Sequence, residues 1–197
     1  GQTIRELIQD GVLPRAFERF AVHMDRPLYQ HQLESLKKII NGQNLIVSTG
    51  TGSGKTESFL YPILRELACE YENNSLSPGI RALLIYPMNA LANDQIERLR
   101  ELLAAFPEIT YGSYTGQTKE SYKDALVEYR SLNGGAFPAE NELISREQMK
   151  AAPPHILVTN YAMLEYLLVR PKESELFSAK LRQHWRFIVL DEAHVYN

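Results

Sequence analysis

The stretch VSTGTGSGKT, residues 47–56, sets three glycines among small hydroxyl-bearing residues directly before a helical pattern. Glycine allows the positive φ angles and the close backbone approach that a bound phosphate chain requires. The helix that follows presents its positive dipole end to an anion. Lys55 is placed to reach the β- and γ-phosphates of a nucleotide, and Thr56 is placed to bind Mg²⁺. The stretch therefore indicates a phosphate-binding loop, between a strand at Leu45–Val47 and a helix that begins near Gly54.

The first position of this loop departs from the strict form of the motif. That form has a glycine six residues before the lysine, where this sequence has Thr49. A glycine-rich turn before a lysine is also compatible with an ordinary strand-to-helix connection, so the loop alone leaves two interpretations open. If it binds a nucleotide, the contacting residues are expected to be Thr49, Gly50, Thr51, Gly52, Ser53, Gly54, Lys55 and Thr56.

A second motif, FIVLDEAH at residues 187–194, favours the nucleotide interpretation. Its apolar strand ends in Asp191 and Glu192, and ligands of open parallel sheets bind at the carboxyl ends of the strands. Asp191 is suited to holding Mg²⁺ through water, and Glu192 to orienting and deprotonating an attacking water. An Asp–Glu pair after a strand is otherwise a solvated turn or a helix cap. Together with the loop, the motif assigns catalysis to Lys55, Asp191 and Glu192, and metal binding to Thr56 and Asp191.

Short apolar runs and helical patterns alternate along most of the chain. Runs that suit strands buried on both faces of a parallel sheet occur at residues 45–47, 82–86, 156–158 and 187–190, with a weaker one at 109–114. Helical patterns occupy residues 57–70, 89–103 and 161–169. This alternation predicts an α/β fold with a doubly wound, mostly parallel sheet flanked by helices.

The beginning of the chain and residues 119–153 interrupt this rhythm. Residues 1–27 predict a helical accessory segment, and residues 28–197 predict the nucleotide-binding domain, incomplete at its C-terminus. Residues 119–153 form an apparent insertion in that domain, with helical pieces on either side of a stretch that bears glycine and proline. A mobile surface loop is one interpretation of the insertion, and contact with nucleic acid or with a partner domain is another.

The composition of the chain excludes several classes of protein. It has 197 residues and a net charge of −3, so the strongly basic character of many nucleic-acid binders is absent, which leaves room only for a local basic groove. One cysteine, Cys69, excludes an internal disulfide and a cysteine-cluster metal site. No apolar run reaches the ~18 residues of a membrane helix and no signal-peptide pattern opens the chain, so we expect a cytoplasmic protein or a fragment of one.

The two phosphate motifs, TGTGSGKT and DEAH, resemble motifs I and II of superfamily 2 helicases. That family accepts a small residue at the position of Thr49. Gln32 precedes Lys55 by 23 residues, a spacing similar to that of the adenine-reading glutamine of these helicases, with an exposed helix glutamine as the alternative. The resemblance implies the first RecA-like domain of a DEAD/DEAH-box ATPase, with ATP and Mg²⁺ as cofactors and a coupling role for His194.

Three further stretches resemble nucleic-acid motifs of the same family, and they follow one another in the family's order. YPMNALANDQ resembles motif Ia, YTGQT resembles motif Ib, and VTNYAML resembles the next strand-binding motif. A proline-terminated strand followed by an asparagine helix cap is the alternative interpretation of the first of these stretches. By resemblance, the residues that contact the phosphates of a bound strand are Pro87, Asn89, Gln95, Thr115, Gly116, Thr159 and Asn160.

Within the family, the sequence resembles large bacterial and archaeal helicases that carry a C-terminal four-cysteine metal-binding region, some of which act in DNA repair or phage defence. The resemblance implies a second RecA-like domain in the same full-length chain, and single-stranded DNA as the favoured partner. That second domain supplies an arginine finger, which contributes on the order of 10³–10⁵ in rate in related enzymes. We therefore expect the present chain alone to bind nucleotide weakly and to hydrolyse little of it.

Three other functions fit parts of the same sequence. A translocase or remodeller of a defence or restriction system uses the same ATPase without separating strands. A non-catalytic nucleotide-sensing module is disfavoured by the presence together of Lys55, Thr56, Asp191 and Glu192. A phosphate-loop kinase or transporter ATPase is disfavoured by Gln32 and by the Ala193–His194 ending of the second motif.

Overall fold

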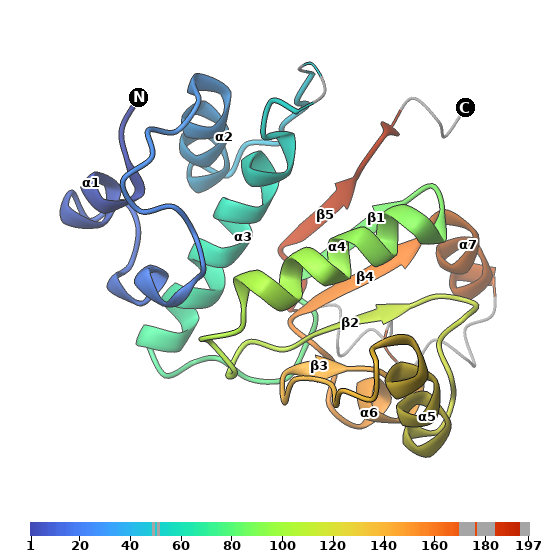
Figure 1. Ribbon diagram of the computed structural model, residues 1–197. Helices are drawn as coiled ribbons and strands as arrows, with labels where there is room; N and C mark the ends of the chain where they lie inside the picture. The colour runs from blue at the N-terminus through green and yellow to red at the C-terminus, as the bar shows by residue number, and fades with distance from the viewer. Residues whose placement is uncertain (49, 51, 170–175, 177–183, 194–197) are drawn as a thin grey trace. The chain divides into compact units, whose positions relative to one another are not determined.

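The computed structural model describes residues 1–48, 50, 52–169, 176 and 184–193 (Figure 1). The chain divides into two compact units, residues 1–76 and residues 77–197. The phosphate loop belongs to the first unit, and all the described strands belong to the second. Among the described helices, none combines the length and the apolar character that crossing a lipid bilayer requires.

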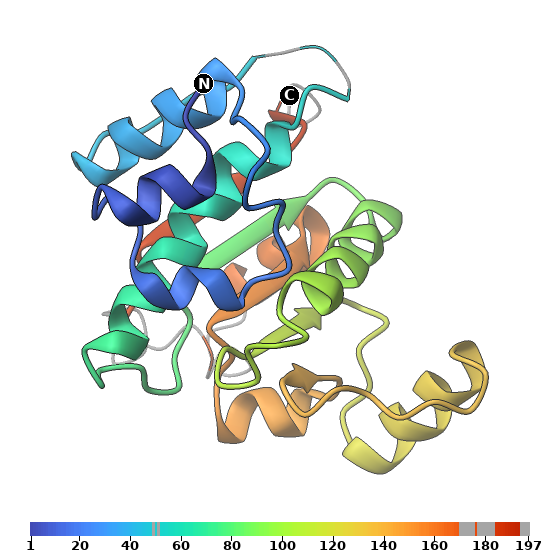
Figure 2. The same cartoon turned by 60° about the vertical axis from the view of Figure 1, so that its left-hand side comes forward.

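The first unit is helical and consists of α1 (Ile4–Gln9), the 3₁₀ helix η1 (Arg15–Arg19), α2 (Gln30–Ile40) and α3 (Lys55–Glu72). Helix α2 packs along α3 (Figure 2), and η1 contacts the same helix. The ring of Phe17 meets the ring of Tyr61 edge-on, with 6.0 Å between the centroids. The Arg65 side chain donates a hydrogen bond to the Val12 carbonyl oxygen at 2.8 Å. These contacts hold the helix that follows the phosphate loop against the N-terminal segment.

The second unit is built on a five-stranded sheet with the strand order β3-β2-β4-β1-β5. Its elements, in chain order, are β1 (Ala82–Tyr86), α4 (Asn89–Leu102), β2 (Tyr111–Tyr114), α5 (Tyr122–Leu132), β3 (Glu142–Leu143), α6 (Arg146–Ala151), β4 (Ile156–Asn160), α7 (Tyr161–Val169) and β5 (Phe187–Leu190). Every described pairing between these strands is parallel. The prediction of a parallel α/β sheet is thereby confirmed.

Helices cover both faces of this sheet (Figure 1). Leu83, Ile85 and Leu157 form one buried cluster with Met163 and Leu167 of α7. Alternate residues of a strand point to opposite faces. The intervening buried residues of β1 and β4 therefore face the other side, where α4 contacts β1, β2 and β4. The sheet is doubly wound, as the alternation of strands and helices predicted.

Residues 119–153, the predicted insertion, contribute α5, β3 and α6. Strand β3 pairs in parallel with β2. Gly112 of β2 permits this approach, because a Cβ there would lie 2.8 Å from the Leu143 carbonyl oxygen and 2.9 Å from the Met149 sulfur. The insertion thus extends the sheet by one strand, which the interpretation as a surface loop did not anticipate.

A buried ion pair joins β3 to α4. The Glu142 carboxylate, whose side chain is 4% exposed, accepts two hydrogen bonds from Arg100, both at 2.8 Å. The hydroxyls of Tyr111 and Tyr129 each donate to the same carboxylate at 3.3 Å. Burial raises the pKa of both phenols, and the nearby carboxylate raises it further, so both stay protonated at neutral pH. The insertion is therefore tied to the sheet by a fully hydrogen-bonded carboxylate.

Replacing Glu142 with glutamine is expected to weaken this connection by about 2 kcal/mol, because the Arg100 guanidinium then lacks an anionic partner. In the full-length protein, the backbone amides of β2 and β3 should exchange with deuterium roughly 30-fold faster. Glu140→Gln, at an exposed position of the same insertion, is the matched control and should leave the exchange unchanged. A Glu142→Gln rate within about threefold of wild type would contradict the role of the ion pair.

The strand predicted at Leu45–Val47 is wrong. Those residues form no strand, and Ile46 is 95% exposed. An apolar run becomes a strand only where a neighbouring strand pairs with its backbone, and none of the described strands pairs with this segment. Helix α3 nevertheless begins at Lys55, one residue after the predicted start at Gly54.

Candidate nucleotide and nucleic-acid sites

The phosphate loop ends in the first turn of α3. Gly52 and Gly54 have φ angles of 74° and 75°, in the left-handed region that glycine adopts without strain. The Ser53 hydroxyl donates to the Gly50 carbonyl oxygen at 2.7 Å and closes the turn. Gly54, the N-cap residue of α3, has no side chain to cap the helix, so the first amide groups of α3 are suited to a ligand.

Lys55 and Thr56 stand at this uncapped end, and both are partly exposed. Lys55 forms no ion pair with any residue that the structure describes. A left-handed glycine turn, uncapped amides, an ammonium and a hydroxyl are the groups that a phosphate chain with Mg²⁺ requires. The residues present therefore fit a nucleotide. Thr49 and Thr51, which were also expected to contact it, lie outside the described residues.

Gln32 is tied to the phosphate loop by its own side chain. Its Nε2 donates to the Gly54 carbonyl oxygen at 3.0 Å, and its Oε1 accepts from the Tyr29 backbone N–H at 3.0 Å. The side chain is buried, so it is not the exposed helix glutamine of the alternative interpretation. A Cβ at position 54 would crowd the Gln32 amide, and the positive φ of Gly54 favours glycine there.

Asp191 and Glu192 follow β5 in the second unit, and both are partly exposed. The Asp191 N–H donates to the Ile85 carbonyl oxygen at 3.0 Å, which continues the ladder to β1. Glu192 has a φ of 50°, and its N–H donates to Asp191 Oδ1 at 3.0 Å. Such φ angles are uncommon outside glycine and cluster at functional positions. His194, the predicted coupling residue, lies outside the described residues.

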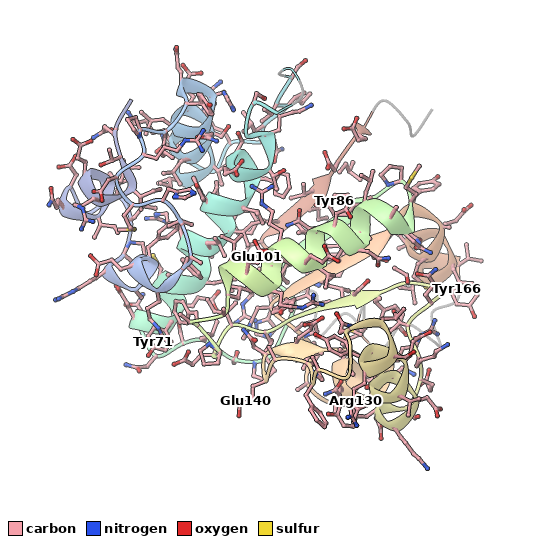
Figure 3. All side chains as sticks on the ribbon, in the orientation of Figure 1. Tyr71, Tyr86, Glu101, Arg130, Glu140 and Tyr166 are labelled. Carbon is pink, nitrogen blue, oxygen red and sulfur yellow. The ribbon has the colours of Figure 1, made fainter. Side chains whose placement is uncertain are left out.

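Strands β1, β2 and β4 end beside one another, and most of the residues predicted to contact nucleic acid lie at or just after these ends. In the register of the sheet, Tyr86 of β1 lies opposite Asn160 of β4, and Tyr114 of β2 lies opposite Thr159. Because these strands are parallel, the turns that follow them meet at one edge. Figure 3 labels Tyr86 at the end of β1 and Tyr166 on α7. The turns or strand ends at this edge contribute Pro87, Asn89, Thr115, Gly116, Thr159 and Asn160.

Asn160 joins two of these turns. Its Nδ2 donates to Asn89 Oδ1, and its Oδ1 accepts from the Met163 N–H at 2.7 Å, so it also caps α7. The buried Thr159 hydroxyl donates to the Tyr114 carbonyl oxygen at 2.7 Å. Thr159 is therefore engaged in fixing β4 to β2, whereas Asn89 and Asn160 line a pocket.

The remaining candidates differ in their accessibility. Gly116 is exposed, and a Cβ there would meet nothing within 4 Å. Thr115 is buried, and its N–H donates to Thr118 Oγ1 at 2.9 Å. Gln95 is 6% exposed on α4, and Pro87 is half-buried. Neither Gln95 nor Pro87 lines the pocket at this edge.

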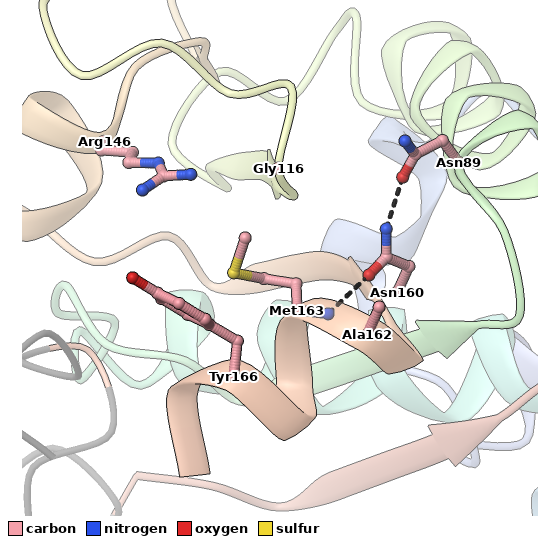
Figure 4. A pocket seen from close by; sticks show the side chains of 7 residues that line it. All are labelled: Asn89, Gly116, Arg146, Asn160, Ala162, Met163 and Tyr166. Carbon is pink, nitrogen blue, oxygen red and sulfur yellow. Dashed lines mark hydrogen bonds between the residues drawn. The ribbon is translucent and has the colours of Figure 1, made fainter. Parts of the chain in front are cut away.

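The pocket has a volume of about 420 Å³ (Figure 4). It is lined by Asn89, Gly116, Arg146, Asn160, Ala162, Met163 and Tyr166. Three residues predicted from the nucleic-acid motifs thus meet in one place. Sequence reasoning missed the other four, because Arg146 lies in the insertion and the α7 residues follow an ordinary helical pattern.

Comparison with known proteins identifies relatives of the chain. The profile of the family described as DEAD/DEAH box helicase matches residues 29–197. Druantia protein DruE of Escherichia coli (strain UMEA 4076-1) is 30% identical over 85% of this chain and 14% of its own length. ATP-dependent helicase Lhr-Core of Methanothermobacter thermautotrophicus is 31% identical over 83% of this chain and 17% of its own length. The chain therefore spans only a small part of these relatives.

Solved structures share the fold. The crystal structure of DUF1998 helicase MrfA bound to DNA superimposes with a TM-score of 0.68 at 24% sequence identity. The match covers 94% of this chain and 20% of that chain. A crystal structure of the same helicase bound to DNA and AMPPNP gives a TM-score of 0.65. At this identity the likeness concerns the fold alone, which is the RecA-like arrangement expected from the sequence.

Proposed function

The chain belongs to the DEAD/DEAH box helicase family, and we propose that it is the ATP-binding half of an ATP-dependent nucleic-acid helicase. The observation that carries this proposal is the hydrogen bond from Gln32 to the Gly54 carbonyl oxygen. This hydrogen bond connects Gln32, the candidate for recognising the adenine, with the loop that is the candidate for binding the phosphates. One contact therefore links the residues suited to the two ends of ATP. A phosphate loop in general needs no such glutamine.

In this proposal, the first unit binds ATP with Mg²⁺. Lys55 neutralises the β- and γ-phosphates, Thr56 holds the metal ion, and the first amides of α3 donate to phosphate oxygens. Gln32 recognises the adenine, with its amide oriented by the Tyr29 N–H and the Gly54 carbonyl. The nucleotide supplies the phosphoryl group whose transfer to water releases the energy.

Asp191 and Glu192 are assigned to Mg²⁺ and to the attacking water. The Glu192 N–H engages one Asp191 oxygen and leaves the second for a water of the metal ion. Glu192 accepts the proton of the attacking water in its carboxylate. Phosphoryl transfer needs positioning and charge neutralisation above all, and these two carboxylates with Lys55 and Thr56 supply both.

We further propose that the partner is DNA, with a single strand favoured. Both MrfA crystal structures with this fold are bound to DNA. In the present chain, the ends of β1, β2 and β4 bring Asn89, Gly116 and Asn160 to one pocket. Contacts of this kind to the sugar–phosphate backbone position a strand without reading its bases. This matches a motor that has to move along any sequence.

A second RecA-like domain of a longer chain is proposed to complete the ATPase and to supply an arginine finger. The chain matches only 14% and 17% of two relatives, which supports a longer protein. ATP binding draws the two domains together and hydrolysis releases them, with His194 as the coupling residue. The motor is proposed to act in the cytoplasm, in DNA repair or phage defence.

Replacing Gln32 with alanine should raise the KM for ATP of the full-length protein about 10-fold or more, because two buried hydrogen bonds and the adenine contact are lost. The KM for GTP should rise less, so the preference for ATP shrinks. Gln30→Ala on the same helix is the matched control, since Gln30 is exposed and its side chain bonds to Glu34 and not to the phosphate loop that the structure describes. An equal rise in both KM values would show that Gln32 shapes the loop and does not read the base.

The experiment that tests the function measures ATP hydrolysis by the full-length protein with and without single-stranded DNA or RNA, beside displacement of a labelled strand. Stimulated hydrolysis with strand displacement is the expected result. Stimulation with movement but without displacement would identify a translocase or remodeller of a defence or restriction system. Hydrolysis that no nucleic acid stimulates would favour a nucleotide-sensing module.

A further inference from the structure

Arg146 is the single charged side chain among the described residues that line the pocket at the ends of β1, β2 and β4. It begins α6, in the insertion, and reaches back to the end of β2. Its Nη2 donates to the Thr115 carbonyl oxygen at 3.1 Å, and its guanidinium lies over the Tyr114 ring, 5.0 Å from the centroid. These two contacts hold a cation at the wall of the pocket.

The charge of Arg146 is not neutralised by a carboxylate in the part of the chain that the structure describes. Two lysines of the same insertion differ in this respect. Lys119 pairs with Glu128 at 3.3 Å, and Lys150 pairs with Glu120 at 2.6 Å. A side-chain cation without a carboxylate partner attracts an anionic ligand to the pocket beside it. A cation that is already paired with a carboxylate attracts such a ligand only weakly.

The guanidinium also keeps donors for a ligand. It carries five N–H groups in a planar fork, and the Thr115 carbonyl accepts from one of its terminal nitrogens. The fork matches two oxygens of a phosphate, and such contacts are shorter and stronger than neutral hydrogen bonds. Arg146 is therefore suited to a phosphate group more than to a neutral polar ligand.

The rest of the pocket suits the nucleoside attached to such a phosphate. Figure 4 shows Arg146 on one side, the amides of Asn89 and Asn160 on the other, and Met163 between them. Met163 and Tyr166 add thioether and aromatic surface from α7. The pocket, of about 420 Å³, is an open depression and not an enclosed cavity, so it leaves room for a strand that continues beyond it. Aromatic side chains beside a cation are the usual means of holding single-stranded nucleic acid.

We propose that Arg146 binds a backbone phosphate of the nucleic acid and that the attached nucleoside lies against Met163 and Tyr166. The inference rests on the proposed function and extends it to residues 119–153, which thereby take part in gripping the strand. The contact positions the strand and does not select its sequence, because phosphate carries no base information.

A purely structural role for Arg146 predicts a different result. Its contacts with Thr115 and Tyr114 also hold α6 to β2, so its loss could weaken binding indirectly. An indirect effect lowers the affinity by the same factor at every salt concentration. Loss of a phosphate contact also flattens the salt dependence, because one counterion fewer is released on binding. The salt slope therefore separates the two roles.

The test measures binding of the full-length protein to a fluorescent oligothymidylate by anisotropy, between about 50 and 200 mM KCl. Arg146→Gln is expected to weaken binding about 10-fold at the lowest salt. The slope of log K against log salt should fall by about 0.7, the value for one contact to a single strand. Arg146→Lys keeps the charge, so it should keep the slope and lose only part of the affinity.

Arg130→Gln is the matched control. Arg130 lies on α5 of the same insertion (Figure 3), bonds to the Gly135 carbonyl oxygen at 3.1 Å and lies over the Phe137 ring at 4.5 Å. It therefore resembles Arg146 in its contacts, but it does not line the pocket. Its replacement should leave both the affinity and the salt slope at the wild-type values.

A second pair of variants tests the pocket without touching Arg146. A Cβ at Gly116, which lines the pocket, meets nothing within 4 Å, so a short side chain is accommodated there without a clash. Gly116→Asp adds a negative charge to the wall that holds Arg146 and should weaken binding about 10-fold. Gly116→Asn has nearly the same shape without the charge and should bind several-fold more tightly than Gly116→Asp.

The outcomes separate this inference from the function on which it rests. Weaker binding with a flatter slope in Arg146→Gln, together with a difference between Gly116→Asp and Gly116→Asn, supports the phosphate contact. Wild-type binding in Arg146→Gln, or weaker binding with an unchanged slope, overturns it while the proposed function stands. Failure of the wild-type protein to bind any nucleic acid, with or without ATP, overturns both.

Discussion

Lys55→Ala should lower the kcat for ATP hydrolysis by the full-length protein on the order of 10³-fold. The lysine stands at the uncapped N-terminus of α3, where its charge adds to the helix dipole at the phosphates. The transferred phosphoryl group gains charge on its oxygens in the transition state, and Lys55 at the start of α3 is placed to neutralise that charge. The measurement is the steady-state rate at saturating ATP and DNA.

The control for Lys55→Ala is Lys38→Ala, the same change at an exposed position of α2. Its rate should equal that of wild type. Thermal unfolding of both variants should also match wild type, because neither lysine is buried. ATP turnover by Lys55→Ala at more than about a tenth of the wild-type rate would remove Lys55 from the phosphate site.

Glu192→Gln should lower kcat by about 10²–10⁴-fold while leaving the affinity for ATP close to that of wild type. The amide keeps the shape of the side chain and cannot accept the proton of the attacking water. The affinity is spared because the nucleotide is held by Lys55, Thr56 and the loop. Single-turnover hydrolysis and equilibrium binding of a labelled nucleotide, both on the full-length protein with DNA, measure the two effects separately.

Glu192→Gly distinguishes the carboxylate from the backbone at the same position. Glycine adopts the observed φ of 50° without strain, so it relaxes the turn while it removes the side chain. If the carboxylate is the base, Glu192→Gly is as inactive as Glu192→Gln. Glu101→Gln, at an exposed position of α4, is the control and should be fully active. A weakened ATP affinity equal to the loss of kcat would reassign Glu192 to nucleotide binding.

The sequence predicted the centre of the sheet well. The apolar runs at 82–86 and 156–158 became β1 and β4, with β4 two residues longer than its run. The run at 187–190 became β5, the last described strand on the β1 side, but the prediction that it is buried on both faces is wrong, since Ile188 and Leu190 are exposed. β1 and β4 are buried throughout, so every position in them has to be apolar or satisfied within the fold, and the pattern is unmistakable. The same reasoning placed α4 and α7 within one residue of their observed ends.

Strand pairing explains what the sequence did not reveal. Leu45–Val47 has the composition of a strand but no described partner, and local composition carries no information about partners. The opposite error concerns β3, two residues that no pattern marks. Gly112 carried the one available signal, since glycine within a strand often indicates close approach of another backbone.

The candidate sites divide in the same way. Lys55, Thr56 and the Asp191–Glu192 pair belong to compact motifs whose spacing along the chain is their signal. For the contact between Gln32 and Gly54, the only signal in the sequence was the spacing of Gln32 from Lys55, which is similar to that in superfamily 2 helicases. Arg146 reaches the pocket through the pairing of β3 with β2 and the placement of α6, and sequence separation conceals such a neighbour.

Strand β3 also has a consequence for how the protein behaves in concentrated solution. It is the last described strand on the β2 side of the sheet, and it is only two residues long. A long bare strand with unpaired amides and carbonyls recruits strands of other molecules, and a very short terminal strand discourages this. Excision of residues 119–153 would uncover the backbone of Tyr111 and Gly112, the two residues of β2 that pair with β3. The insertion therefore limits edge-to-edge pairing between molecules. A version of the protein without residues 119–153 should self-associate more readily.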